Sequence, residues 1–93
     1  MSPPVVFIFR HCPPPHLTAL AEWGFSVASL SRCPGVEHVA DARSYIEGKF
    51  VIIVGDRWRA EELGVGHATV AYVEKFLRWL SKEVPAVYKP YTQ

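Results

Sequence analysis

The chain has 93 residues, of which 49% are hydrophobic and 13% aromatic, so it is rich enough for one small folded domain and too apolar for a disordered one. Ten basic and nine acidic residues give a formal net charge of +1, which argues against a protein that binds nucleic acid through bulk charge. A small anionic ligand held by a few placed cations is compatible with that balance.

Membrane and metal patterns are not evident. No apolar run approaches the roughly 20 residues of a membrane span, and the N-terminal Met-Ser-Pro-Pro lacks the basic flank of a signal peptide. We therefore expect a cytoplasmic protein without membrane contact. Cys12 and Cys33 are too few for a zinc framework, and we expect no metal and no cofactor. Both cysteines follow predicted strands, so a disulfide is conceivable, but free thiols are expected in that compartment.

The first half of the chain predicts two strands and two helices. Residues 5–9 are continuously apolar, which is typical of a strand buried on both faces of a parallel sheet. A helix is expected over residues 15–23, with Gly24 as its C-terminal stop. A second strand is expected over residues 25–30 and a second helix over residues 36–47.

The second half continues the alternation. Residues 50–54 are a second unbroken apolar run, which predicts a third strand, and one helical turn is compatible with the charged stretch that follows. A third helix is expected over residues 67–82 and a fourth strand over residues 84–88. The pattern predicts an α/β fold: one Rossmann-like, three-layer domain over residues 1–93, with a mainly parallel sheet of about four strands in the order 2-1-3-4 and three helices.

The expected third helix has apolar side chains around roughly half of its circumference, which is more than packing on a sheet usually requires. Two interpretations stay open. The helix is either a core helix in a thin domain or a dimer contact through Tyr72 and Trp79.

Polar residues follow the predicted strands at positions that the strand order brings together. The order reverses between the first and third strands, and ligands of such sheets bind beyond the carboxyl ends of the strands at that point. Arg10 and His11 follow the first strand, and Asp56 follows the third. The full set expected at this edge is Arg10, His11, Ser31, Arg32, Gly55, Asp56, Arg57 and Lys89.

The sequence Gly-Val-Gly-His-Ala-Thr over residues 64–69 stands at the expected start of the third helix. Free backbone N–H groups at a helix start, together with glycines, can bind a phosphate, which adds Gly66, His67 and Thr69 to the candidate ligand-binding residues. Simpler interpretations stay open: the glycines shape a loop, His11 is a surface residue, and Asp56 caps a turn.

Two segments carry a resemblance to a known family. Phe-Arg-His-Cys-Pro over residues 9–13, followed by a helix, and Gly-Asp over residues 55–56 resemble the small stand-alone CRISPR-associated ring nucleases, whose fold is similar to CARF (CRISPR-associated Rossmann fold) sensor domains. The closing segment over residues 84–88 also fits that group. Gly-His over residues 66–67 is similar to a motif of viral anti-CRISPR ring nucleases.

The resemblance implies metal-independent cleavage of a cyclic oligoadenylate second messenger, which would switch off type III CRISPR signalling. It implies that a ribose 2′-hydroxyl attacks the adjacent phosphate, with His11 as general acid or base and Arg10, Arg57 and Lys89 on phosphates. A homodimer would match the symmetry of such a ligand. The ring size, and whether His11 or His67 is catalytic, stay open.

Two other classes of function remain. Arg-His directly after a first strand also resembles the opening motif of the histidine phosphatases, although Cys12 stands where that family has a glycine. A non-enzymatic module, sensing a ligand or binding a protein partner as a dimer, is equally compatible with a Rossmann-like fold, since a fold does not determine a function.

Overall fold

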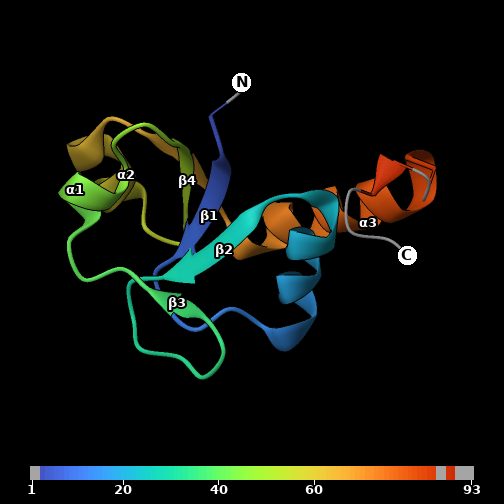
Figure 1. The fold of residues 1–93 in the computed structure, drawn as a ribbon, viewed down its shortest axis with the longest axis horizontal. Coiled ribbons are helices and arrows are strands. Elements are labelled where there is room, and N and C mark those ends of the chain that lie inside the picture. Colours follow the sequence, from blue (N-terminus) through green and yellow to red (C-terminus); the bar gives the residue numbers. More distant parts are fainter. Residues whose placement is uncertain (1–2, 86–87, 90–93) are drawn as a thin grey trace.

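A parallel sheet of five strands forms the centre of the computed structural model, which describes residues 3–85 and 88–89 (Figure 1). The strands lie in the order β3-β2-β1-β4-β5, and every neighbouring pair is parallel. Their bounds are Val5–Phe9 for β1, Ser26–Ser29 for β2, Glu37–His38 for β3, Phe50–Val54 for β4 and Gly66–Ala68 for β5. The expected α/β, Rossmann-like fold is confirmed.

The two central strands have the bounds that their apolar runs predict. β1 and β4 pair in register from Val5 opposite Phe50 to Phe9 opposite Val54. Along β1 the side chains alternate between the two faces, so Ile8 joins one hydrophobic cluster and Phe9 joins the other. Both faces are covered, and this is why the sequence of these strands shows no polar alternation.

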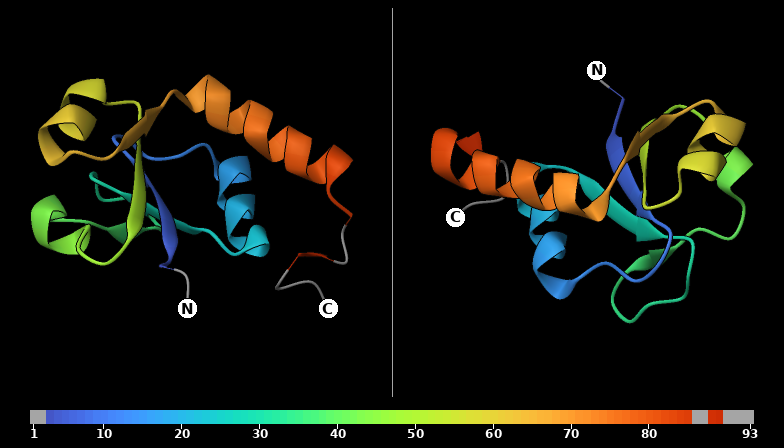
Figure 2. Two further views of the ribbon diagram at one scale, coloured as in Figure 1. Left: turned by 90° about the horizontal axis from the view of Figure 1, so that it is seen from above. Right: turned by 180° about the vertical axis from the view of Figure 1, so that it is seen from behind.

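Helices cover both faces of the sheet, as the left view of Figure 2 shows. Helices α1 (Ala42–Tyr45) and α2 (Arg57–Leu63) lie on one face. The 3₁₀ helix η1 (Pro15–Trp23) and helix α3 (Val70–Glu83) lie on the other. The result is the expected three-layer arrangement. In the part of the chain that the structure describes, no helix combines the length and apolar character needed to cross a membrane.

The expected helix over residues 36–47 is wrong in its first half. Residues 37–38 instead form the edge strand β3, which pairs with the end of β2. The backbone N–H of Val39 then donates to Ser29 O at 2.8 Å, which keeps the chain extended. The helix begins only after Asp41, whose carboxylate accepts a hydrogen bond from the backbone N–H of Ser44.

The side chain of Tyr45 ties helix α1 to strand β3. Its hydroxyl donates a hydrogen bond to Glu37 Oε1 at 2.8 Å. Partial burial is the largest cause, and this hydrogen bond the second, of a rise in the pKa of Tyr45 to about 12. The phenol therefore stays a neutral donor at any ordinary pH. The two-residue strand is therefore anchored by a side chain as well as by its backbone.

The expected start of the third helix at residue 67 is also wrong. Residues 66–68 form the second edge strand, β5, and α3 begins at Val70 after Thr69, whose hydroxyl oxygen accepts from the backbone N–H of Tyr72 at 3.0 Å. β5 takes the place beside β4 that was expected for residues 84–88. Of that segment, Val84, Pro85 and Tyr88 are not in a strand, and residues 86–87 lie outside the described residues.

Candidate functional site

The chain leaves β1 and β4 in opposite directions, toward β2 from β1 and toward β5 from β4. This is the switch point at which Rossmann-like sheets bind ligands. The backbone N–H of Arg10 donates to Val54 O at 3.0 Å, which continues the β1–β4 ladder into the loops. A Cβ built on Gly55 would lie 3.9 Å from the Arg10 Cβ, so the two loops run side by side.

Arg10 and Asp56 meet across the switch point. Arg10 Nε lies 4.0 Å from Asp56 Oδ2, as the predicted strand order required. Asp56 Oδ1 also accepts a hydrogen bond from the backbone N–H of Arg59 at 3.0 Å and caps helix α2, so the simpler interpretation of Asp56 holds too. The Arg10 side chain is 55% exposed, and an ion pair this open adds little stability.

The end of β2 holds the loop that carries Arg10 and His11. Ser31 Oγ donates to Arg10 O at 2.8 Å, and Ser29 Oγ donates to His11 O at 3.2 Å. Ser29 is fully buried, and its Oγ also accepts from the backbone N–H of Ser31 at 3.0 Å. Ser31 was among the candidates predicted from the sequence and Ser29 was not, because Ser29 lies within strand β2. The His11 residue itself is exposed to solvent.

We call Arg10, His11, Ser31 and Asp56 the strand-end cluster. It offers a permanent cation, an exposed histidine and a carboxylate 4.0 Å from the Arg10 Nε. A guanidinium can bind the oxygens of a phosphodiester, and an imidazole can give or take a proton near neutral pH. The arrangement is therefore chemically suited to an anionic phosphate ligand.

A disulfide joins Cys12 and Cys33, with a Cα–Cα distance of 5.6 Å. The expectation of free thiols is therefore wrong for this structure. The physical reason is the pairing of β1 with β2 as neighbouring parallel strands, because the two cysteines follow their carboxyl ends by three and four residues. Similar spacing beyond two neighbouring strands was the signal in the sequence. Free thiols were expected in spite of it, because a reducing compartment was assumed.

Lys89 lies apart from the strand-end cluster, so its expected position was wrong. Its Nζ lies 3.3 Å from Glu22 Oε1 and 5.0 Å from the centre of the Trp23 ring. Trp23 ends η1 and precedes β2, which places this contact at the amino end of that strand. The expected position depended on the predicted strand over residues 84–88. The carboxyl end of that strand would have brought Lys89 to the same edge of the sheet as Arg10.

The residues of the glycine-rich stretch have structural roles. Gly64 ends helix α2 with a φ of +69°, and Gly66 begins strand β5 opposite Ile52. His67 lies in the edge strand β5 opposite Ile53. Gly66 and His67 therefore lie in a strand before helix α3, and of the three candidates here Thr69 alone stands at the helix start, where its hydroxyl oxygen caps α3.

Three other candidates, Gly55, Arg57 and Arg32, are sequence neighbours of the strand-end cluster. The backbone N–H of Gly55 donates a hydrogen bond to Ala68 O at 3.0 Å. The Arg57 Nε lies 3.4 Å from Glu61 Oε1 on the surface of α2. Arg32 is exposed in the loop between β2 and β3, directly before Cys33.

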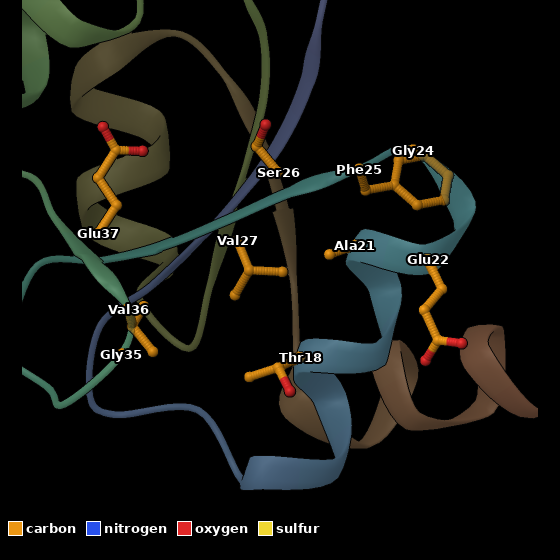
Figure 3. Close-up of a pocket in the computed structure, with 10 residues that line it drawn as sticks. All are labelled: Thr18, Ala21, Glu22, Gly24, Phe25, Ser26, Val27, Gly35, Val36 and Glu37. Atoms are coloured by element: carbon orange, nitrogen blue, oxygen red, sulfur yellow. The ribbon is translucent and has the colours of Figure 1, made fainter. Parts of the chain in front are cut away.

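A shallow cavity of about 590 Å³ lies away from the switch point, between η1 and the first residues of β2 and β3 (Figure 3). Two carboxylates, Glu22 and Glu37, are among its lining residues, and no member of the strand-end cluster is. An acidic rim does not suit an anionic ligand. The lining residues are Thr18, Ala21, Glu22, Gly24, Phe25, Ser26, Val27, Gly35, Val36 and Glu37.

Comparison of this chain with protein-family models, curated proteins and solved structures finds no match. The functional argument therefore rests on the strand-end cluster itself, on its place in the fold and on the motif resemblance of residues 9–13 and 55–56.

Proposed function

We propose that this protein binds a cyclic oligoadenylate at the strand-end cluster and cleaves it without a metal, as a ring nuclease that ends type III CRISPR signalling in the cytoplasm. One observation carries the proposal: Arg10 and His11 stand at the switch point, with the Arg10 guanidinium facing Asp56 at 4.0 Å. The resemblance of residues 9–13 and 55–56 to ring nucleases selects the class of ligand.

The proposed reaction needs groups of these two types. A ribose 2′-hydroxyl attacks the adjacent phosphorus and the 5′-oxygen leaves, so a 2′,3′-cyclic phosphate and a 5′-hydroxyl are formed. Arg10 stabilises the charge that develops on the non-bridging oxygens. His11 takes the proton of the nucleophile or supplies one to the leaving oxygen. Both side chains are exposed enough to meet a ligand.

The direct test is to incubate the pure protein with labelled cyclic tetra-adenylate and cyclic hexa-adenylate in the presence of EDTA. Linear products ending in a 2′,3′-cyclic phosphate are expected, because the mechanism uses no metal. The proposal is abandoned if both rings stay intact and neither binds. Hydrolysis of a generic phosphomonoester by the same sample would instead favour the histidine-phosphatase alternative.

A dimeric, non-enzymatic module is the second candidate, and helix α3 supplies the observation for it. Tyr72 and Trp79 are 65% and 52% exposed, so neither belongs to the core. They are seven residues apart and share one face of the helix. The Phe76 ring stacks on Trp79 at 6.2 Å between centres, which presents the indole as a fixed apolar surface. A second copy of the chain is the proposed occupant of this face.

We expect Trp79→Glu to convert a dimer into a monomer, because it places a charge where apolar surface would be buried. Light scattering coupled to size-exclusion chromatography would measure the change as a halving of the mass. Trp58→Glu is the matched control, since Trp58 is 82% exposed and lies on α2. A wild-type protein that is monomeric at high concentration, or equal effects of both substitutions, would contradict the proposed face.

A further inference from the structure

The Cys12–Cys33 disulfide joins the two loops that carry the proposed site. Cys12 directly follows His11, and Cys33 directly follows Arg32. Hydrogen bonds from the Ser29 and Ser31 hydroxyls to the carbonyls of His11 and Arg10 also join the two loops. The disulfide thus joins two residues that are 21 positions apart in the sequence, at the point where ligand contact is proposed.

Both cysteines are partly accessible from solvent. Cys12 is exposed and Cys33 is half-buried. Both line a cavity of about 430 Å³ whose other lining residues include Pro13, Pro15 and Pro34. These prolines give the cavity stiff apolar walls. A small dithiol, or the active-site loop of a reducing protein, can therefore approach the bond without unfolding the domain.

We propose that the Cys12–Cys33 bond is a redox switch that regulates the strand-end cluster, with the ligand bound well when the bond is formed and poorly when it is broken. The inference rests on the proposed function, including its cytoplasmic setting. Disulfides of cytoplasmic proteins are mostly transient and redox-sensing, because that compartment keeps thiols reduced.

The chemistry is a thiol–disulfide exchange with a dithiol. One thiolate of the dithiol attacks either sulfur, and a mixed disulfide forms as the other cysteine leaves as a thiolate. The second thiol of the dithiol then displaces the remaining cysteine. Two electrons pass to the protein, two protons finish on Cys12 and Cys33, and the dithiol becomes a disulfide. Oxidation by a disulfide reverses each step.

Reduction is expected to loosen His11 and Arg32 more than Arg10. Arg10 is still held by its backbone hydrogen bond to Val54 O and by Asp56. His11 keeps the hydrogen bond from Ser29 to its carbonyl, and both His11 and Arg32 lose the covalent link beside them. A ligand must then order these residues as it binds, and that ordering opposes binding.

The test compares the oxidised protein with the same sample reduced by dithiothreitol. We expect affinity for cyclic tetra-adenylate to fall about fivefold or more, the lower end of coupling between linked sites, and to return on reoxidation. Amide hydrogen exchange at residues 11–12 and 31–35, Pro34 excepted, is expected to accelerate on reduction, while Arg10 and β4 stay protected. The double variant Cys12→Ser, Cys33→Ser should bind cyclic tetra-adenylate with the affinity of the reduced protein, and dithiothreitol should not change that affinity.

The two readouts separate this inference from the proposed function. If neither redox state binds or cleaves the ring, the proposed function fails. Amide hydrogen exchange at residues 31–35 then decides by itself whether the Cys12–Cys33 bond controls the order of the loop. If the ring binds equally in both states, the regulation is overturned and the proposed function stands. Unchanged exchange on complete reduction also overturns it. Wild-type protein answers both questions even if the double variant does not fold.

Discussion

His11→Ala is expected to lower the rate of ring cleavage about 100-fold or more, the usual loss when a general acid or base is removed. Affinity for the ring should change little, because the imidazole acts on a proton and the guanidinium of Arg10 supplies the permanent charge. Single-turnover cleavage and equilibrium binding of labelled cyclic tetra-adenylate measure the two effects separately. Arg10→Ala is expected to weaken both binding and cleavage.

His67→Ala is the matched control for this substitution. His67 is also an exposed histidine, but it lies in the edge strand β5 and not at the switch point. We expect near wild-type cleavage from it. The reverse result, with His67→Ala inactive and His11→Ala active, would move the catalytic assignment to β5 and contradict the proposed site. Loss of binding in His11→Ala would show that His11 is a ligand contact instead.

Phe9→Ala is expected to destabilise the fold by about 3–5 kcal/mol, the usual cost of emptying a buried aromatic site. Phe9 is 2% exposed and packs in the cluster with Leu17, Leu20 and Val73 that joins η1 and α3 to the sheet. Small domains are stable by only about 5–15 kcal/mol, so the loss is a large share of the total. Urea denaturation followed by circular dichroism measures it.

Phe50→Ala removes the same side chain from the first residue of β4, where Phe50 is 60% exposed. Its expected effect is within about 0.5 kcal/mol, as for ordinary surface substitutions. If the two substitutions cost the same, then the burial that the structure gives to Phe9 is wrong. Because Phe9 directly precedes Arg10, ligand binding by Phe9→Ala should be measured only at urea concentrations where the variant is folded.

The strand-end cluster could be predicted in part because it depends on long, strongly patterned elements. The apolar runs over residues 5–9 and 50–54 predict two buried parallel strands, and their parallel pairing places Arg10 beside Asp56. The contribution of β2 could be foreseen less well. Ser31 was expected nearby, but Ser29 reads as an ordinary residue of a strand, and its role depends on a carbonyl from a distant loop.

The incorrect predictions share a physical cause. Strands β3 and β5 have two and three residues, which is too short for any periodicity to show. Residues 37–38 and 66–68 are extended because neighbouring strands offer them hydrogen-bond partners, and those partners are far away in the sequence. Lys89 was misplaced for the same reason, since its position follows from contacts with Glu22 and Trp23.

The sequence by itself determined the class of fold, the two central strands and the meeting of Arg10 with Asp56, because unbroken apolar runs must be buried on both faces of a sheet. Only the tertiary structure decided the edge strands, the Cys12–Cys33 bond and the exposure of Tyr72 and Trp79. Each of these depends on which distant segment lies alongside, and local pattern carries no information about that neighbour.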